Sequence, residues 1–406
     1  MSRLAKLVPR ALQPRFEQLR RDVRTVFADL RGERAPTWLP RSGARYPAST
    51  TLATRECEVV EVVRETADAI SLVLRDPGGA ELPRVRPGQF FTLLVPHSDR
   101  ADQAPLRRAY SASGDCRDRA RVRLTIKRVE GGRASNWLLE HAEAGMRLRV
   151  LGPSGEFGVA PDPNAPPRTL ILIAGGSGIT PMMAILHTLL PVEPAARVAL
   201  IDANRSEPDI VFRAELDALV AQQGDRFTLV HTLEQPPSDW SGHVGRLDGA
   251  TLDSILATLA LADAPEAEFL LCGPLPMMTA ARATLHERGI ADARIRQEDF
   301  FAFAPSEPSQ ARVGLRDPQP VTLVLGAREV GLVVQPGQTL LEAGLAAGLP
   351  MPYSCAMGGC AACRVQVERG EVVMQEPNCL GASERAAGFV LACIGSPTCP
   401  SRIRVN

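Results

Sequence analysis

The sequence predicts a multidomain fold: a small antiparallel β-barrel, then a parallel α/β sheet, then a small α+β domain that carries a group of cysteines. Three observations predict this order. Short alternating strands broken by glycine and proline turns fill residues 51–163, strands alternate with helices over 164–304, and spaced cysteines lie within 320–406. Alternation with a period of two indicates antiparallel strands, whereas buried strands that alternate with helices indicate a parallel sheet.

Length and charge limit the possible functions. The chain has 406 residues, enough for several domains, and its 46 basic residues balance 46 acidic ones, so no nucleic-acid partner is expected. No apolar run approaches the ~18 residues of a membrane span, and no secretory signal opens the chain. Thiolate ligands need a reducing compartment, so we expect a cytoplasmic protein.

Residues 1–50 form a basic N-terminal extension with eleven basic and four acidic residues. Apolar side chains recur at three- and four-residue steps from Pro14 to Leu30, which predicts a basic amphipathic helix. A helix packed on its own domain is one interpretation. The other is a helix that docks on a membrane surface or on a membrane-bound partner, which would make the protein peripherally membrane-associated.

The predicted barrel, residues 51–163, contains two loops with possible binding chemistry. Arg108-Ala109-Tyr110-Ser111 follows a strand and groups a guanidinium, an aromatic ring and a hydroxyl, but such a group also arises by chance. Gly132-Arg133-Ala134-Ser135 opens a helix, where bare N–H groups bind phosphate, although Ser135 can also be a simple N-cap. The predicted strands are Cys57–Arg64, Ile70–Leu74, Phe90–Val95, Val122–Arg128 and Arg147–Leu151, with a helix at Ser135–Glu140.

The predicted α/β domain, residues 164–304, places a glycine-rich turn after its first strand. Gly175-Gly176-Ser177-Gly178-Ile179-Thr180-Pro181 leads from that strand into a helix, which is where a dinucleotide phosphate binds in parallel sheets, but a plain tight turn is a rival interpretation. The predicted strands are Thr169–Ala174, Val198–Asp202, Phe227–Thr232 and Glu268–Cys272. The first predicted helix follows the glycine-rich turn and ends at Leu190, and the other three are Arg213–Gln222, Leu252–Leu261 and Met277–Glu287.

Two further segments of this domain carry chemistry. Cys272-Gly273-Pro274 ends a strand of the same sheet, so its backbone should face the same crevice. The Cys272 thiol is either a packed core residue or a neighbour of a bound nucleotide. Glu298-Asp299-Phe300 lies after the last strand, where a carboxylate and an aromatic ring can close over a ligand, or where Glu298 is simply solvated.

The last predicted domain, residues 320–406, follows a linker at 305–319 and contains Cys355, Cys360, Cys363 and Cys393. The C-x4-C-x2-C…C spacing is that of a plant-type 2Fe–2S cluster, with small residues between the thiols that let backbone N–H groups approach sulfur. Structural zinc usually needs two C-x2-C pairs, and one is present. Disulfides are the other alternative. Strands at Val321–Leu325 and Glu329–Val334 and a helix at Gln338–Ala347 are expected.

Taken in order, these motifs resemble the ferredoxin–NADP reductase superfamily. With the cysteine pattern, residues 52–406 are similar to three-domain oxygenase reductases ordered flavin, nicotinamide, ferredoxin. That branch includes the reductases of phenylacetyl-CoA epoxidase, 3-ketosteroid 9α-hydroxylase and fatty-acyl desaturases, and Thr125–Val129 and Ala134–Leu138 resemble the steroid hydroxylase reductase in particular. The resemblance implies an FAD-binding β-barrel, an NAD(P)-binding α/β domain and a β-grasp ferredoxin domain.

The resemblance also implies roles for single residues. Arg108 would hold the FAD phosphate, Tyr110 beside Ala109 would stack on the isoalloxazine ring, and Ser111 would approach its N5 atom. Lys127 and Val129 would line the ribityl chain, while Gly132, Arg133, Ala134 and Ser135 would cradle the pyrophosphate. The turn of Gly175, Gly176, Gly178, Thr180 and Pro181 would hold the nicotinamide dinucleotide together with Cys272, Gly273 and Pro274, and Glu298 and Phe300 would flank the ring stack. Ser111, Cys272 and Glu298 are the candidate catalytic residues.

The choice between NADH and NADPH stays open. The family makes it near the end of the second sheet strand, where Arg205 and Ser206 would hold a 2′-phosphate while Glu207 and Asp209 would oppose it.

The sequence therefore predicts an NAD(P)H-dependent reductase with FAD and a 2Fe–2S cluster that passes electrons to a separate oxygenase, hydroxylase or fatty-acid desaturase. A hydride carries two electrons, which flavin accepts together and the cluster takes singly. The alternatives are a self-contained flavin, ferric or quinone reductase and a redox-sensing protein. The final acceptor, the oligomeric state and the roles of Cys57, Cys116, Cys379 and Cys399 do not follow from the sequence.

Overall fold

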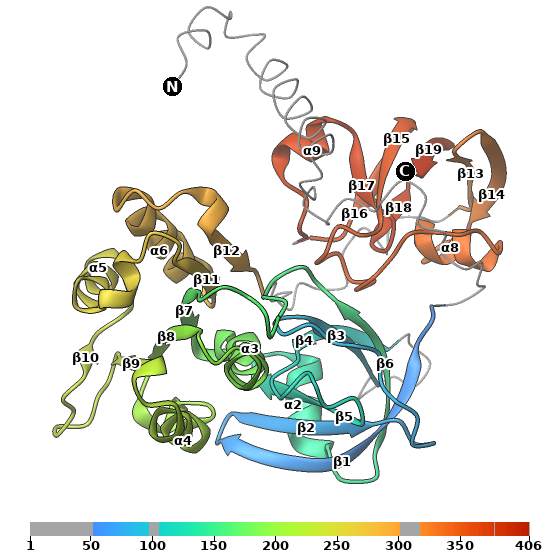
Figure 1. Cartoon of the computed structure of the whole chain (residues 1–406). Helices are drawn as coiled ribbons and strands as arrows, with labels where there is room; N and C mark the ends of the chain where they lie inside the picture. The colour runs from blue at the N-terminus through green and yellow to red at the C-terminus, as the bar shows by residue number, and fades with distance from the viewer. Residues whose placement is uncertain (1–51, 97–104, 301–316, 377, 406) are drawn as a thin grey trace, which may run out of the picture. The chain divides into compact units, whose positions relative to one another are not determined.

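The structure is a computed structural model that describes residues 52–96, 105–300, 317–376 and 378–405 (Figure 1). The basic helix predicted within residues 1–50 and most of the predicted linker at 305–319 lie outside the described residues. The described residues all belong to one compact unit. Within these ranges, no helix combines the length and the apolar character needed to cross a bilayer.

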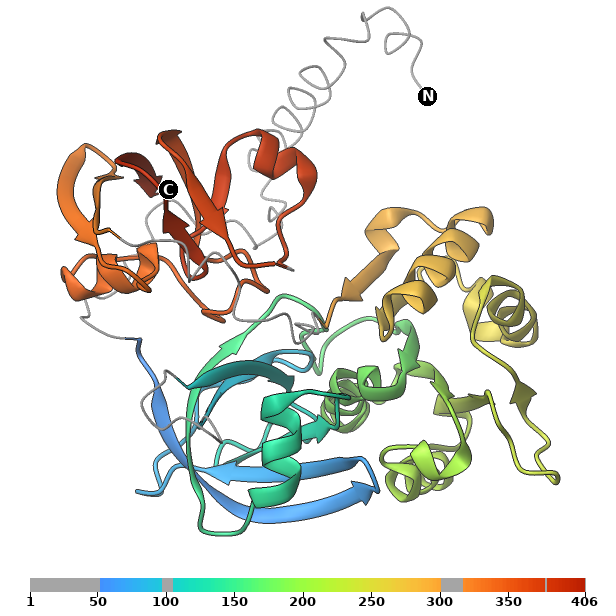
Figure 2. The ribbon, with the colours of Figure 1, turned by 180° about the vertical axis from the view of Figure 1, so that it is seen from behind.

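The first region is an antiparallel barrel of six strands in the order β4-β3-β6-β1-β2-β5. A bridge between Ala112 and Leu124 joins the two edge strands and closes the sheet on itself. Helix α2 (Arg133–His141) lies against the barrel (Figure 2). Its Leu138 and Leu139 side chains belong to the barrel core. The strands are β1 (Arg55–Thr66), β2 (Ala69–Arg75), β3 (Phe90–Val95), β4 (Leu106–Ser111), β5 (Arg121–Lys127) and β6 (Arg147–Ser154).

One detail of the barrel differs from the sequence prediction. Arg108–Ser111 was expected to follow a strand, but it is the second half of β4, paired with β3 from Phe90 to Val95. The sequence Leu-Arg-Arg-Ala-Tyr-Ser lacks the apolar alternation of the other strands, because every residue of β4 before the buried Ser111 is only half-buried. The strand geometry fixes the direction of each side chain, with Arg108 and Tyr110 on one face and Arg107 and Ala109 on the other.

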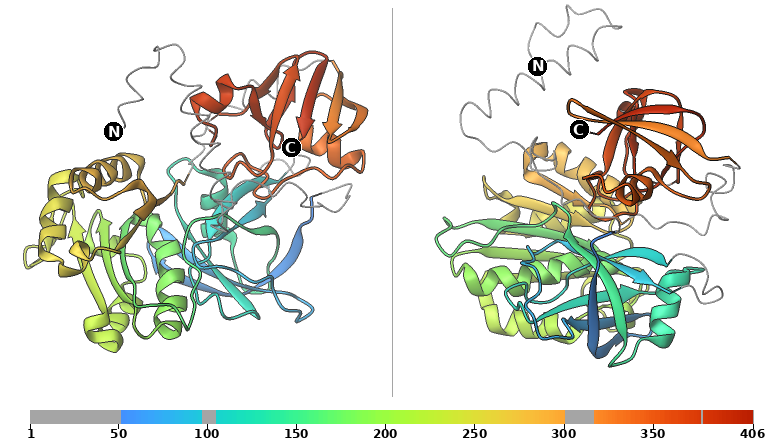
Figure 3. Two further views of the ribbon diagram at one scale, coloured as in Figure 1. Left: turned by 45° about the horizontal axis from the view of Figure 1, so that its top comes forward. Right: turned by 90° about the vertical axis from the view of Figure 1, so that its right-hand side faces the viewer.

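The second region is a six-stranded parallel sheet in the order β10-β9-β8-β7-β11-β12. Helices α3 and α4 cover one face and α5 and α6 the other, so the core has two layers (Figure 3). The chain moves outward from β7 in one direction and returns to β11 on its other side, which creates a switch point at the carboxyl ends of β7 and β11. The strands are β7 (Thr169–Gly175), β8 (Arg197–Asn204), β9 (Phe227–Leu233), β10 (His243–Val244), β11 (Glu268–Cys272) and β12 (Ile295–Glu298), and the helices are α3 (Ile179–Val192), α4 (Arg213–Gln223), α5 (Gly249–Thr258) and α6 (Leu275–Glu287).

The four strands and four helices predicted for this sheet are confirmed. The sequence missed β10 and β12, which have two and four residues. Strand β12 reads Ile-Arg-Gln-Glu and is mostly half-buried at the sheet edge, so it lacks an apolar run. Glu298 is therefore the last residue of a strand and faces the crevice that β7 and β11 form.

The third region is a five-stranded mixed sheet in the order β14-β13-β19-β15-β17, in which β13 and β19 are parallel. Helix α8 (Leu340–Ala346) begins with a capping box in which Thr339 and Glu342 satisfy each other's backbone N–H groups. The other elements are β13 (Gln319–Leu325), β14 (Arg328–Val334), β15 (Arg364–Arg369), β16 (Val372–Met374), α9 (Ala382–Ala386), β17 (Phe389–Leu391), β18 (Gly395–Pro397) and β19 (Ser401–Val405).

Candidate functional site

The four cysteines with ferredoxin spacing come together in two pairs. The Cys363 and Cys393 sulfurs lie 3.2 Å apart, and the Cys355 backbone N–H donates to the Cys360 sulfur at 3.4 Å. All nine cysteines lie in the described part of the chain and are free thiols, so the disulfide alternative is wrong. Cys393 lies in the turn between β17 and β18.

The loop around these thiols has an unusual backbone. Ala356 and Ala361, each directly after a cysteine, have φ values of 52° and 55°, in the left-handed region that alanine rarely adopts. Gly358 has φ of 82°, and a side chain there would also press on Ile394. This backbone turns N–H groups toward sulfur. The Cys360 thiol and the N–H groups of Met357, Gly359 and Cys360 together lower the pKa of Cys355 to about 6, against the opposing effect of burial.

These features fit a two-iron cluster. A thiolate that accepts several backbone N–H bonds is the ligand that iron–sulfur proteins use. A single zinc ion would need four ligands around one point, whereas two pairs of sulfurs suit two irons with two protein ligands each. The geometry therefore disfavours the zinc alternative.

A cavity opens beside the cluster loop. It is bounded by residues of all three regions: Phe90, Arg108, Ala109, Ser111, Glu298, Asp299, Phe300, Cys355, Met357 and Gly359. The Ser111 hydroxyl is buried and has no hydrogen-bond partner among the described residues. A buried hydroxyl costs free energy unless a partner satisfies it, so this atom is suited to a polar ring atom of a bound ligand.

Arginines beside the cavity suit an anionic ligand. Burial lowers the pKa of Arg108, and the nearby Arg133 guanidinium lowers it further. Arg108 on β4 and Arg133 at the start of helix α2 repel each other, and a pyrophosphate between them would stabilise both cations. Burial also raises the pKa of Tyr110 well above its usual value, so its phenol stays neutral. Arg108, Arg133 and Tyr110 therefore fit the flavin nucleotide that the sequence implied.

The loop before helix α2 is shaped for close approach. The N-cap is Gly132, with no side-chain cap, so the simple N-cap interpretation of Ser135 is wrong. The Ser135 hydroxyl instead accepts a hydrogen bond from the Val129 N–H at 3.1 Å. A side chain on Gly132 would collide with Val129 and Ser135. Ala134 is buried, Lys127 is half-buried and Val129 is 44% exposed, so Val129 lies at the rim.

The glycine-rich turn packs tightly against the neighbouring strand end. A side chain at Gly178 would collide with the Cys272 carbonyl, and one at Gly175 would collide with Pro274 and Met277. Gly176 has φ of 53°. The turn therefore needs glycine for space and for backbone conformation, and its backbone and that of Gly273 come together at the switch point.

Thr180, Pro181 and Cys272 are placed differently from the glycines. The buried Thr180 hydroxyl donates to the Ser177 carbonyl at 3.0 Å and thereby holds the turn, while Pro181 is buried in the first turn of α3. Cys272 is fully buried in the core of the sheet. Burial, with smaller effects from Glu298 and Asp299, raises its pKa well above the usual value. Its thiol is a neutral core group, which agrees with the interpretation of Cys272 as a packed core residue.

Glu298 is the most perturbed carboxyl of the cavity. It is half-buried at the end of β12, and desolvation followed by the charge of Asp299 raises its pKa to about 8. Phe300 lines the same cavity and is 39% exposed. The carboxyl is thus largely protonated at neutral pH and can donate a hydrogen bond or a proton into the cavity.

The ferredoxin-like region contacts the barrel through its cysteine loop, a set we call the cluster-side contact. The Thr92 hydroxyl donates to the Cys355 carbonyl at 3.1 Å. Arg107 donates to the Ala356 carbonyl at 3.1 Å and pairs with Glu342 of α8 at 3.0 Å. Two of these three hydrogen bonds therefore end on backbone carbonyls of the ligand loop, and the third ends on α8.

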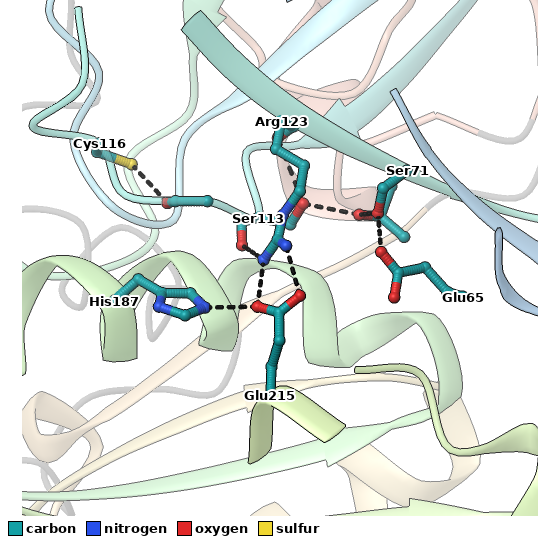
Figure 4. Close-up of polar contacts among 9 residues, drawn as sticks. Glu65, Ser71, Ser113, Cys116, Arg123, His187 and Glu215 are labelled. Atoms are coloured by element: carbon teal, nitrogen blue, oxygen red, sulfur yellow. Dashed lines mark hydrogen bonds and ion pairs between the residues drawn. The ribbon is translucent and has the colours of Figure 1, made fainter. Parts of the chain in front are cut away.

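The parallel sheet contacts the barrel through a polar network, the nicotinamide-side contact (Figure 4). Two guanidinium nitrogens of Arg123, on β5, donate hydrogen bonds to the Glu215 carboxylate of α4 at 2.6 and 2.9 Å. His187 of α3 lies 2.8 Å from the same carboxylate, and Arg123 stacks over the Phe212 ring. The Thr188 hydroxyl lies 2.9 Å from the Cys116 N–H and accepts its hydrogen bond.

Several cavity and contact residues were missed by sequence reasoning. Phe90 and Met357 line the cavity, and Thr92 and Arg107 hold the cysteine loop. Phe90 and Thr92 look like ordinary strand residues, and Met357 like a spacer between cysteines. Only Arg107 carried a signal, as a second arginine directly before the Arg108 motif.

Comparisons with known proteins define the class. The chain matches the oxidoreductase FAD-binding domain over residues 56–158, the oxidoreductase NAD-binding domain over 172–283 and the 2Fe-2S iron-sulfur cluster binding domain over 325–398. It is an oxidoreductase whose cofactors are FAD, a nicotinamide dinucleotide and a 2Fe–2S cluster. Its fold matches the solved phthalate dioxygenase reductase with a TM-score of 0.60 and 21% identity, over 87% of this chain and 98% of that one.

Two relatives define the family more narrowly. The chain is 38% identical to the ferredoxin reductase component of 3-ketosteroid-9-alpha-monooxygenase from Mycolicibacterium smegmatis, over 85% of this chain and 95% of the relative. It is 36% identical to one of the subunits of 1,2-phenylacetyl-CoA epoxidase from Escherichia coli, over 84% of this chain and 94% of the relative. The chain belongs to this family of three-domain, flavin- and iron–sulfur-containing reductase components.

Proposed function

We propose that this chain takes electrons from a reduced nicotinamide dinucleotide and passes them, through its FAD and its 2Fe–2S cluster, to a separate terminal oxygenase. The observation that carries the proposal is the single cavity lined by Ser111 of the barrel, Glu298 of the parallel sheet and Cys355 of the cysteine loop. A ligand in that cavity would contact all three regions. One of the relatives named above is, by name, the ferredoxin reductase component of a monooxygenase, and the other is a subunit of an epoxidase.

FAD, when bound, accepts the two electrons of a hydride and releases them one at a time, as the cluster requires. In this proposal Arg108 and Arg133 hold the pyrophosphate at the start of α2, Tyr110 stacks on the ring system, and the unpaired Ser111 hydroxyl meets a ring nitrogen. Gly132, Ala134 and Ser135 keep the helix start open for the pyrophosphate, while Lys127 and Val129 border the chain that joins ring and phosphate.

The nicotinamide dinucleotide would lie at the switch point of the sheet. The N–H groups of the turn from Gly175 to Pro181 face its phosphates, and Gly273 and Pro274 bound the same crevice. Thr180 holds the turn through Ser177, and the neutral Cys272 thiol supports it from the core. Glu298 keeps a proton beside the reacting atoms, and Phe300 excludes water from them.

Electrons would leave through the outer side of the cysteine loop. Cys355, Cys363 and Cys393 are buried, whereas Gly359, Cys360, Ala361 and Ala362 are half-exposed. An acceptor that docks on this half-exposed edge comes near the cluster without entering the protein. More specifically, the acceptor in this proposal is a hydroxylase or a fatty-acid desaturase. Residues 1–50 contact a membrane surface or a membrane protein, and the protein is located in the cytoplasm.

The experiment that tests the function compares Cys360→Ser with Cys399→Ser in purified holoprotein. Cys360→Ser should abolish electron delivery to the partner oxygenase, while ferricyanide, which flavin reduces directly, is still reduced. Cys399, a half-buried thiol outside the two sulfur pairs, should tolerate serine with both activities retained. Equal loss of both activities in Cys360→Ser, with FAD released, would mean that the loop is needed for folding rather than electron exit.

A self-contained flavin or quinone reductase is the second candidate, because the cavity alone contains what flavin chemistry needs. It predicts that Cys360→Ser keeps full turnover with the physiological acceptor. A redox sensor predicts instead that the variant loses regulation and keeps turnover. Reconstitution with the oxygenase encoded or purified alongside the chain separates the three functions.

A further inference from the structure

The segment after β8 combines one arginine, one serine and two acidic residues: Arg205, Ser206, Glu207 and Asp209. Strand β8 neighbours β7, whose end opens the glycine-rich turn, and the chain continues past Asn204 into Arg205 and Ser206. In parallel dinucleotide-binding sheets this strand end lies beside the adenosine ribose, where an acidic residue accepts from the 2′-hydroxyl or an arginine holds a 2′-phosphate. Here an arginine and acidic residues are both present.

The structure joins the arginine and one of the acidic residues. Arg205 donates from Nε and Nη2 to both oxygens of Asp209, at 2.9 and 2.7 Å. The Ser206 hydroxyl donates to the same carboxylate at 2.6 Å. A guanidinium fork with a hydroxyl is the donor set that a phosphate would use. Asp209 therefore occupies, as an internal anion, the position that a 2′-phosphate needs.

We propose that Asp209 makes this protein select NADH over NADPH, because its carboxylate already fills the anion site formed by Arg205 and Ser206. The proposal rests on the proposed function, since it concerns the dinucleotide of that site. The Asp209 side chain is only 12% exposed, whereas that of Arg205 is 62% exposed, so the carboxylate is the fixed partner and the guanidinium is held to it.

The charges around this position also oppose a phosphate. The cations Arg205 and Lys127 face the carboxylates of Asp209, of Asp68 at 3.9 Å from Arg205, of Glu234, and of Asp202, which also contacts the His231 ring at 3.3 Å. Among the described residues, the buried Oδ1 of Asp202 has no hydrogen-bond partner. Glu207 is already paired with Arg213. A 2′-phosphate with a charge of about −1.5 to −2 at neutral pH would add to an excess of negative charge.

A ribose with a free 2′-hydroxyl, as in NADH, can form a hydrogen bond at this position. An ionised carboxylate has about four lone-pair sites, and Asp209 receives three hydrogen bonds from Arg205 and Ser206. One site remains for a donating hydroxyl, and no charge has to be added. The same residues that repel NADPH thus give NADH a hydrogen-bond acceptor.

The test measures binding rather than turnover. Oxidised holoprotein is titrated calorimetrically with ADP-ribose and with 2′-phospho-ADP-ribose, which contain the discriminating groups but no nicotinamide. ADP-ribose should bind at least about tenfold more tightly, the effect of one unfavourable charge contact. In Asp209→Asn the phosphorylated ligand should gain about tenfold while ADP-ribose changes little.

Two further variants keep the test decisive. Glu207→Gln removes a charge from the same turn, but one already paired with Arg213, and should leave the preference unchanged. Adding Arg205→Ala to Asp209→Asn should cancel the gain, because the released guanidinium is what would hold the phosphate. Asp209→Ser repeats the experiment with a smaller side chain, and flavin content and the thermal melt show that each variant is folded.

Equal or tighter binding of the phosphorylated ligand by the wild-type protein would overturn the proposal, as would an unchanged preference in folded Asp209→Asn. Failure of both ligands to bind would instead overturn the placement of the dinucleotide, and with it the proposed function.

Discussion

The barrel is held on its two sides by contacts of different kinds. On the cluster side, Thr92 and Arg107 bind backbone carbonyls of the cysteine loop itself. On the nicotinamide side, Arg123 binds the Glu215 side chain, which lies on α4 and not on the glycine-rich turn. The cluster-side contact therefore positions ligand atoms directly, whereas the nicotinamide-side contact positions a domain. Changes on the two sides should slow different steps.

The largest effect is expected inside the cysteine loop. Gly358→Ala forces alanine to φ of 82° and presses a methyl group on Ile394, whereas Ala361→Gly relieves alanine at 55°. A left-handed alanine costs about 1–2 kcal/mol before the steric contact is added. We therefore expect Gly358→Ala to lose most of its cluster and Ala361→Gly to keep it, measured as iron and sulfide per chain. Equal cluster content in the two variants would contradict this account of the loop.

The next largest effect is expected when the cluster-side contact and the nicotinamide-side contact are each removed. Arg107→Ala removes bonds to the Ala356 carbonyl and to Glu342 and should slow cluster reduction about tenfold, while flavin reduction by NADH is unchanged. Arg123→Ala should slow flavin reduction and leave the later transfer to the cluster unchanged. Rapid mixing at two wavelengths separates the steps. If both variants slow the same step, the contacts do not differ in function.

A smaller effect is expected for the cavity carboxyl. The pKa of Glu298 is raised to about 8, so the group is neutral below that pH and charged above it. In the proposed function Glu298 lies beside the reacting atoms, where a negative charge opposes the arrival of a hydride. Flavin reduction should therefore fall about threefold or more as pH rises through 8. Glu298→Gln mimics the neutral form and should give a flat profile. A wild-type profile that stays flat from pH 6 to 9 would refute this role.

The smallest effect is on stability. Burial opposes ionisation of Glu215, but His187 and Arg123 overcome it and lower its pKa to about 2, below the usual 4.5. A lowered pKa gives stability that is present above about pH 4.5 and is lost as the pH falls toward 2. Glu215→Gln should cost about 1 kcal/mol at pH 7, because a partly exposed pair is screened by water. The cost should vanish near pH 2; denaturant unfolding at both pH values checks this.

More of the fold than of the contacts between the three regions could be predicted from the sequence. The glycine turns, the buried strands and the cysteine spacing are local patterns, and the three regions follow from them. Strands β4 and β12 were missed because half-buried edge strands carry polar residues. Arg107 was missed because its partners Ala356 and Glu342 lie more than 230 residues away in the chain.

The choice between NADH and NADPH could not be predicted from the sequence either. Arg205, Ser206, Glu207 and Asp209 gave a mixed signal in the sequence, because spacing does not tell which groups pair. The structure pairs Arg205 and Ser206 with Asp209, and Glu207 with Arg213. Cys272 is a similar case: its strand-end position suggested a role beside the nucleotide, and its complete burial favours packing.

In the proposed function, electrons pass in order from nicotinamide to flavin to cluster within this chain. Anaerobic mixing of the oxidised holoprotein with NADH, followed by absorbance at flavin and cluster wavelengths in a single turnover, measures this order. We expect flavin to bleach first and the cluster to bleach afterwards, with a rate independent of NADH concentration. A cluster that stays oxidised while flavin is fully reduced, or one that bleaches before flavin, would contradict it.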